Sequence, residues 1–288
     1  MLSRPPASGT AMLPLGTFDG KVVAITGGGT GLGKAMAVEF ARLGATVVIL
    51  SRSEHHLAGG IAAVSEAGGK AIGVTLDVRD GERVRQAFDE IEAQCGSPDV
   101  LINNASGTFT VPAEDMSPNA WRSVVQIVLD GTFFCSREFA RRRMTANSGG
   151  AILNIGSSYA WTGGPGSAHL SAAKAGITNL TQSLAVEWAS SDIRVNTLVP
   201  GPFPHGDLPD HLKALYGSPE AAKKLPAHRV GEPHELGWAA TYLCSPFAAF
   251  VTGHTFVIDG AYWLRHSLHG IPFSPVREQI GAPPFHRE

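Results

Sequence analysis

The sequence predicts an α/β fold in which about seven parallel strands form one doubly wound sheet. Between residues 20 and 263, short runs rich in Val, Ile and Leu alternate with segments whose apolar residues recur at helical spacing. Strands that are apolar throughout are buried on both faces, as in a parallel sheet covered by helices. With right-handed crossovers, this order predicts a Rossmann-type fold in a single domain.

The expected elements follow one another after short turns. The strands are expected at residues 22–25, 46–50, 71–76, 100–102, 151–155, 194–198 and 255–258. The helices are expected at residues 31–43, 57–67, 84–93, 119–144 and 172–189, with one more beginning at Pro233. In the helix at 172–189, Ile177, Leu180, Leu184 and Trp188 fall on one stripe, which predicts the side that faces the sheet.

Three segments lie outside this alternation. Residues 1–19 are rich in Pro, Gly and Thr, which predicts a disordered arm. Residues 203–228 are rich in Pro, Gly and His and follow the carboxyl end of a strand, where such folds place their ligands. This segment is expected to be a mobile lid over the substrate. Residues 264–288 carry four prolines and are expected to form an irregular tail.

Composition excludes several classes of protein. The 288 residues carry a net charge of −2, so no basic surface for nucleic acid is expected. No run of about 18 apolar residues predicts a membrane span, and the N-terminal stretch lacks the apolar centre of a secretory signal. Cys95, Cys135 and Cys244 lack metal-site spacing and are expected to be free thiols in a reducing compartment, which favours the cytoplasm and no metal.

A glycine-rich loop joins the first expected strand to the first expected helix. Gly27, Gly31 and Gly33 have the spacing Gly-x3-Gly-x-Gly, with Thr30 and Leu32 between them. Backbone without a Cβ lets a pyrophosphate approach the free N–H groups at the helix N-terminus. A tight turn is the alternative, but the position between strand and helix favours a dinucleotide-binding loop.

The second expected strand is followed by Ser51 and Arg52, where NAD-specific proteins carry an acidic residue that binds the ribose 2′-hydroxyl. Arg52 instead offers a planar fork for a 2′-phosphate, with Ser51 as a second donor. A solvated surface arginine is the alternative. The pattern predicts NADPH as the cofactor.

Lys174 is the centre of the expected chemical site and is placed in the first turn of its helix. Leu170 stands four residues before it and has no ionisable group. Tyr159 stands fifteen residues before Lys174, and Ser157 stands seventeen before it. The alternatives are a solvated helix lysine, an aromatic wall residue and a generic turn serine.

The glycine spacing and the positions of Ser157 and Lys174 resemble those of the short-chain dehydrogenase/reductase superfamily. The Tyr159-to-Lys174 spacing resembles that of its NADPH-dependent 2,4-dienoyl-CoA reductases, whose active tyrosine lies on the loop after the fifth strand. The resemblance extends from Lys21 to Tyr262. It is densest at residues 25–34, 117–121, 128–132 and 200–202.

The resemblance implies roles for further residues. Lys174 is expected to bond the nicotinamide ribose and lower the pKa of the Tyr159 phenol. Other cofactor contacts are implied for Asp77, Val78, Asn104, Pro200 and Gly201, although Asp77 is alternatively read as part of a helix cap near Asp80. Thr108 stands where that family often has an Asn for the thioester oxygen. Asp130 replaces the superfamily's helix-kink Asn and is expected to relay protons or satisfy backbone groups.

The resemblance implies reduction of a 2,4-dienoyl-CoA to a 3-enoyl-CoA in unsaturated fatty acid degradation. It also implies an acyl-CoA partner and a homotetramer paired through the helices at 119–144 and 172–189. The alternative is a ketone/alcohol oxidoreductase, for example a 3-oxoacyl reductase, but Leu170 cannot supply the hydroxyl which that reaction needs. A non-enzymatic relative is the third possibility, and the retention of Lys174, Ser157 and the glycine loop argues against it.

Overall fold

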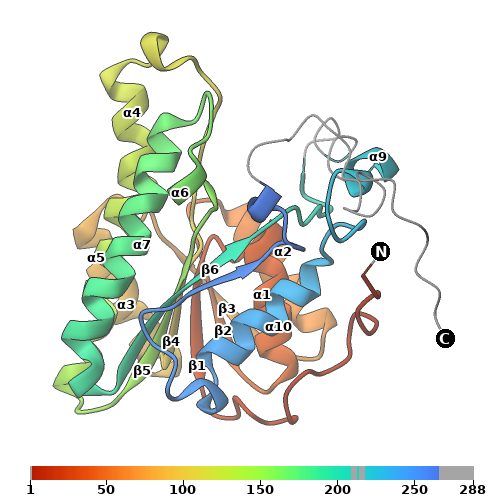
Figure 1. Cartoon of the computed structure of the whole chain (residues 1–288). Coiled ribbons are helices and arrows are strands. Elements are labelled where there is room, and N and C mark those ends of the chain that lie inside the picture. Colours follow the sequence, from red (N-terminus) through yellow and green to blue (C-terminus); the bar gives the residue numbers. More distant parts are fainter. Residues whose placement is uncertain (1, 209–212, 214–217, 266–288) are drawn as a thin grey trace.

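Seven parallel strands form one sheet in the order β3-β2-β1-β4-β5-β6-β7 (Figure 1). The computed structural model describes residues 2–208, 213 and 218–265. The strands are β1 (Val22–Thr26), β2 (Thr46–Ser51), β3 (Lys70–Thr75), β4 (Val100–Asn103), β5 (Gly150–Ile155), β6 (Ile193–Pro200) and β7 (Thr255–Ile258). The strand order reverses between β1 and β4, and such a switch point opens a crevice at the carboxyl edge.

Helices cover both faces of the sheet, so the predicted doubly wound fold is confirmed. Figure 1 shows α1 (Gly31–Arg42) and α10 (Pro233–Cys244) together on one face. α2 (Glu54–Glu66) joins them, while the other face carries α3 (Gly81–Cys95), α5 (Gly131–Thr145) and α7 (Ala168–Trp188). Alternate residues of β1 supply the two cores: Val23 and Ile25 face α1 and α10, and Val22 and Ala24 face the other layer.

The long helix expected at residues 119–144 is divided in the structure. α4 (Pro118–Val125) is followed by one π-helical turn at Gln126–Asp130, and α5 begins at Gly131. A π turn widens the helix without changing the residue types that favour helix, so the sequence pattern did not reveal it. Single π turns are frequent at functional sites, and this one ends at Asp130.

α7 begins at Ala168, four residues before the expected start. Lys174 therefore lies in the second turn of α7 and not in the first, which corrects the expectation. A separate one-turn helix, α6 (Tyr159–Thr162), precedes α7 and carries Tyr159 at its start, where a loop was expected. Gly163, which has a φ of 71°, ends that turn.

The N-terminal arm, expected to be disordered, follows a defined path along α10. The backbone N–H of Leu2 donates to the carbonyl of Ala227 at 2.9 Å, and the indole of Trp238 donates to the carbonyl of Thr10 at 3.1 Å. Phe18 is buried and meets the ring of Phe40 edge-on. Composition predicts disorder where apolar residues are few, but donors supplied by distant elements tie this arm down.

The expected lid and the expected C-terminal tail are described only in part. Within the expected lid at 203–228, the structure describes α9 (Pro219–Lys223), while residues 209–212 and 214–217 lie outside the described residues. Most of the expected tail, residues 266–288, lies outside them as well. No helix in the described part of the chain has the length and apolarity that crossing a membrane requires.

Candidate active site

A cavity of about 690 Å³ opens at the carboxyl edge of the sheet, over the loop between β1 and α1. We call it the glycine-loop cavity. Twelve of the residues expected from the sequence line it, namely Gly27, Thr30, Gly31, Leu32, Gly33, Ser51, Arg52, Asp77, Val78, Asn104, Ser157 and Lys174. The fold therefore brings together residues that are up to 147 positions apart in the chain.

The glycine loop is held in place by hydrogen bonds to the end of β4. The Thr26 hydroxyl accepts from the backbone N–H groups of Asn104 and Ala105, both at 2.9 Å. The Asn104 amide donates to the carbonyls of Thr26 and Gly27 at 2.9 and 3.1 Å. A Cβ on Gly33 would lie 2.3 Å from the Gly27 carbonyl oxygen, so only glycine allows this close approach.

The N-terminus of α1 already holds a negatively charged group. The backbone N–H of Gly31 donates to Asp207 Oδ2 at 2.7 Å, and Lys34 Nζ donates to Asp207 Oδ1 at 3.0 Å. Partial burial alone would raise the pKa of Asp207, but the bonds from Lys34 and Gly31 outweigh it and lower the pKa. Asp207 was not expected from the sequence, because nothing in its local pattern indicates a contact with Gly31.

Arg52 lies at the rim of the same cavity, at the end of β2. Its side chain is 60% exposed, and its Nη1 lies 3.9 Å from Asp77 Oδ2. Asp77 is held mainly by Arg79, whose guanidinium donates at 2.6 Å, and these bonds lower the pKa of Asp77. Asp80, and not Asp77, caps α3 by accepting from two backbone N–H groups. The guanidinium of Arg52 therefore remains accessible to a ligand.

Lys174 is buried in the wall of the glycine-loop cavity, with 5% of its surface exposed. Its Nζ donates to the carbonyl of Ile155, at the end of β5. Burial lowers its pKa from 10.5 to about 8. Leu170 lines the same cavity one turn earlier on α7, so no hydroxyl stands beside the ammonium at that position.

A second cavity, of about 460 Å³, contains Tyr159 and is called the Tyr159 cavity. Its walls are largely apolar and include Pro202, Phe203, Leu225 and Val230. The phenol ring lies against Gly164, where an added Cβ would be 2.7 Å from a ring carbon. Leu32 and Ser157 line both cavities, so the two spaces adjoin at these residues.

The structure separates five of the expected site residues from the glycine-loop cavity, and Tyr159, in the adjoining cavity, is the first of them. Pro200 and Gly201, expected to contact cofactor, instead line the Tyr159 cavity. Thr108 is exposed on the loop after β4, and Asp130 is half-buried at the end of the π turn. Neither Thr108 nor Asp130 lines one of these two cavities in the described part of the chain.

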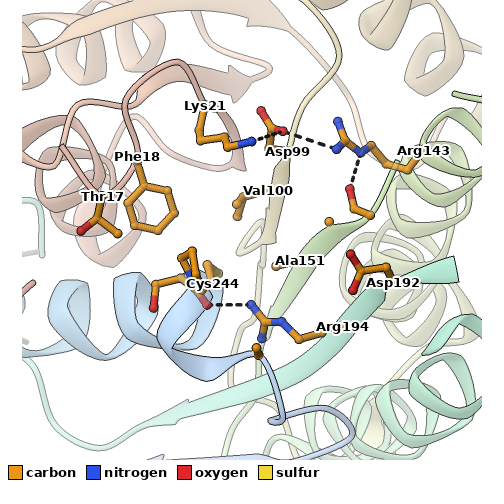
Figure 2. A pocket seen from close by; sticks show the side chains of 15 residues that line it. Thr17, Phe18, Lys21, Asp99, Val100, Arg143, Ala151, Asp192, Arg194 and Cys244 are labelled. Atoms are coloured by element: carbon orange, nitrogen blue, oxygen red, sulfur yellow. Dashed lines mark hydrogen bonds and ion pairs between the residues drawn. The ribbon is translucent and has the colours of Figure 1, made fainter. Parts of the chain in front are cut away.

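A third cavity, of about 390 Å³, lies at the opposite edge of the sheet and is crowded with charge (Figure 2). Asp99 lies between Lys21 and Arg143, at 3.3 and 3.4 Å. Arg143 also donates to the carbonyl of Gly149, and Arg194 donates to the carbonyl of Leu243 at 2.7 Å. These contacts join residues near the amino ends of the strands, so we interpret this charged cluster as a structural one.

Comparison with known proteins gives the family. A family model described as Enoyl-(Acyl carrier protein) reductase matches residues 27–262. A crystal structure of a short chain dehydrogenase from Bacillus anthracis str. 'Ames Ancestor' is 39% identical, with a TM-score of 0.77 over 88% of this chain and 99% of that one. The chain belongs to the short-chain dehydrogenase/reductase family. It is therefore an oxidoreductase of a family that uses nicotinamide cofactors.

Relatives in this family differ in the substrates that their names state. A probable 2,4-dienoyl-CoA reductase [(2E)-enoyl-CoA-producing] of Bacillus subtilis (strain 168) is 38% identical over 85% of this chain and 97% of its own length. A peroxisomal 2,4-dienoyl-CoA reductase [(3E)-enoyl-CoA-producing] of Arabidopsis thaliana is 35% identical over 90% and 89%. The 3-oxoacyl-[acyl-carrier-protein] reductase FabG of Vibrio harveyi is 35% identical over 86% and 99%.

Proposed function

We propose that this protein uses NADPH to reduce a 2,4-dienoyl-CoA to a 3-enoyl-CoA, a reaction of unsaturated fatty acid degradation. One observation carries the proposal. Leu170 stands beside the buried Lys174 in the glycine-loop cavity, while the nearest expected phenol, Tyr159, lines the adjoining apolar cavity. A donor in that position suits an oxygen that lies several bonds away from the carbon that receives the hydride, as the thioester oxygen of a dienoyl chain does.

Several features of the glycine-loop cavity fit a dinucleotide. Gly27, Gly31 and Gly33 line the cavity without side chains, which lets a pyrophosphate approach their backbone, and the N-terminus of α1 already binds the carboxylate of Asp207. Arg52, with Ser51 next to it, offers charge-assisted donors to a 2′-phosphate at the ribose end. No acidic residue ends β2, and Asp77 is engaged by Arg79. These features support NADPH over NADH.

NADPH, held by the glycine loop, Ser51 and Arg52, would supply the hydride for the δ carbon of the dienoyl chain. Negative charge then develops on the thioester oxygen, and the Tyr159 hydroxyl donates a hydrogen bond to it, as in an oxyanion hole. Ser157, which borders both cavities, helps to orient that oxygen. Below pH 8 the Lys174 side chain is mainly protonated, and its positive charge stabilises the negative charge that develops on the thioester oxygen. Water protonates the α carbon.

Thr108 and Asp130 lie outside both cavities and would act only after a movement or through water. The side chain of Thr108 supplies a second donor to the thioester oxygen only if its loop moves inward. Asp130 relays a proton only if a water chain joins it to Lys174. The walls formed by Pro200 and Gly201 hold the acyl chain and the nicotinamide end.

Reduction of a 3-oxoacyl thioester is the second candidate, favoured by the similarity to FabG. It needs a hydroxyl donor beside Lys174, where this chain has Leu170. Tyr159 would have to cross from its own cavity to serve both reactions.

Steady-state oxidation of NADPH with 2,4-hexadienoyl-CoA and with acetoacetyl-CoA tests the proposal. We expect turnover of the dienoyl ester alone. In D₂O the 3-enoyl product should carry solvent deuterium at the α carbon. Turnover of acetoacetyl-CoA without turnover of the dienoyl ester would establish the second candidate. Deuterium at the γ carbon with a 2-enoyl product would correct the position of protonation.

We further propose that the protein is a cytoplasmic homotetramer. A homotetramer is supported by exposed apolar side chains on the helices expected to pair, namely Trp121, Phe133, Met144 and Val186. Light scattering at micromolar concentration checks it, and a monomer would contradict it. A cytoplasmic location is supported by the three free thiols.

A further inference from the structure

Segment 203–208 lies across the glycine loop through two of its side chains. Asp207 accepts from the backbone N–H of Gly31 at 2.7 Å and from Lys34 at 3.0 Å. The ring of His205 lies against Gly31, where an added Cβ would be 2.8 Å from a ring carbon. His205 also lines the glycine-loop cavity. The same segment therefore contacts the start of α1 through two side chains.

We propose that Asp207 competes with the cofactor pyrophosphate for the N-terminus of α1 and thereby holds segment 203–208 closed over the loop. This inference rests on the proposed binding of a dinucleotide at the glycine loop. The N–H of Gly31 is a donor suited to an anion, and the helix dipole adds to the attraction. Two anionic groups cannot share that donor and the Lys34 ammonium without repulsion, so pyrophosphate binding releases Asp207.

The release of Asp207 also affects the Tyr159 cavity, which is the proposed substrate site. The same segment supplies Phe203, Pro204 and Leu208 to the wall of the Tyr159 cavity. Phe203 is buried against Gly231, which fixes the start of the segment. Gly206 has no heavy atom within 4 Å of an added Cβ, so open space lies beside the tip of the segment. Cofactor binding thus reshapes the acyl cavity, and NADPH is expected to bind before the thioester.

The expected effect follows from the population of the closed state. A ligand that binds only the open state has its apparent affinity reduced by the open fraction, so an equilibrium that is nine-tenths closed weakens binding about tenfold. Asp207→Asn removes the charge and keeps the size. It should tighten NADPH and inorganic pyrophosphate by roughly 3- to 10-fold and leave adenosine unaffected, because adenosine carries no phosphate.

The test is a fluorescence titration of NADPH into the full chain, the Asp207→Asn variant and the Glu220→Gln control, with pyrophosphate and adenosine titrated by calorimetry. Glu220 is an exposed acid on α9 that pairs with Lys223, away from the glycine loop. Tighter NADPH and pyrophosphate binding in Asp207→Asn alone supports the proposal. Equal or weaker binding of both overturns it, although the proposed function then stands.

Absence of NADPH binding by the unmodified protein would overturn the proposed function instead, and the pyrophosphate comparison would still decide the inference. Hydrogen exchange on the unmodified protein is the second measurement. Addition of NADPH should accelerate exchange in residues 205–208, because the segment leaves the loop. Slower exchange there would show that the segment closes on the cofactor, which contradicts competition.

Discussion

Leu170 and Lys174 lie one turn apart on α7 and line the same cavity. The ammonium is buried beside an aliphatic side chain, so the wall supplies a positive charge but no hydroxyl at position 170. Tyr159, the candidate donor, is 38% exposed in the adjoining cavity. This separation of the Lys174 ammonium from the Tyr159 hydroxyl is the geometric basis of the proposed reduction of a conjugated thioester.

A phenol introduced at position 170 should create ketone reductase activity. Leu170→Tyr places a hydroxyl one turn from Lys174, and a positioned general acid contributes about 10²- to 10⁴-fold in rate. We expect acetoacetyl-CoA turnover to rise at least about tenfold over the unmodified protein, measured by NADPH oxidation. Leu170→Phe adds the ring without the hydroxyl and should show no gain. Equal activity in both variants would mean that position 170 does not reach the substrate.

Replacing Lys174 should abolish turnover and raise the free energy of unfolding at pH 7. At pH 7 the lysine is charged in both the folded and the unfolded states, so the cost of burying it is fully present. Its folded pKa of about 8 lies below the ordinary 10.5. As the pH rises from the folded to the unfolded pKa, the folded protein loses this proton before the unfolded chain does. The free energy of unfolding therefore increases over this range.

Lys174→Met should therefore raise the free energy of unfolding at pH 7 by about 1–3 kcal/mol and abolish turnover. The gain should shrink at pH 10, because the unmodified protein no longer buries a charge. Urea unfolding at both pH values measures it. A gain that does not change with pH, or a loss of stability at pH 7, would contradict a charged buried lysine.

Arg52→Ala should remove most of the preference for NADPH. Charge-assisted hydrogen bonds contribute about 1.5–3 kcal/mol, so the ratio of NADPH to NADH affinity should fall roughly 10- to 100-fold. Arg85→Ala is the control, since Arg85 pairs with Glu82 and Asp89 on α3. Fluorescence titration with both cofactors gives the ratio. Equal affinities in the unmodified protein would refute the role of Arg52.

Thr26→Val should destabilise the glycine loop. The buried hydroxyl accepts from two backbone N–H groups, which valine leaves without a partner, at a cost of about 2–4 kcal/mol. Thr26→Ser keeps the hydroxyl and should cost less than about 1 kcal/mol. Thermal unfolding of both variants measures the difference. A loss of stability in Thr26→Ser without a loss in Thr26→Val would show that packing of the methyl group, and not the hydroxyl, matters here.

The repeating parts of the fold could be predicted from the sequence. The seven strands were expected within a few residues of their positions, because each is a short apolar run between polar turns. Features that depend on distant partners could not be predicted. The π turn before α5 has ordinary helical composition, and the N-terminal arm is ordered by donors such as Trp238.

The same division holds for the candidate site. Gly27, Gly31 and Gly33 have a spacing that, between a strand and a helix, is typical of a dinucleotide-binding loop, so their place in the cavity could be predicted. Asp207 lies 176 residues from Gly31 in a segment whose composition predicted only irregularity. Local pattern gives no means of pairing such residues, and only the folded chain places that carboxylate on the helix N-terminus.

The turnover of Tyr159→Phe with 2,4-hexadienoyl-CoA tests the central claim most directly. This change removes one hydrogen bond that strengthens in the transition state, and losing such a donor costs on the order of 10²–10³ in turnover. The affinity for NADPH should stay unchanged, because Tyr159 lines the Tyr159 cavity and not the glycine-loop cavity. A fall of that size with unchanged NADPH binding is the result we predict. Near-full turnover in Tyr159→Phe would contradict the account and leave Tyr159 as part of the cavity wall.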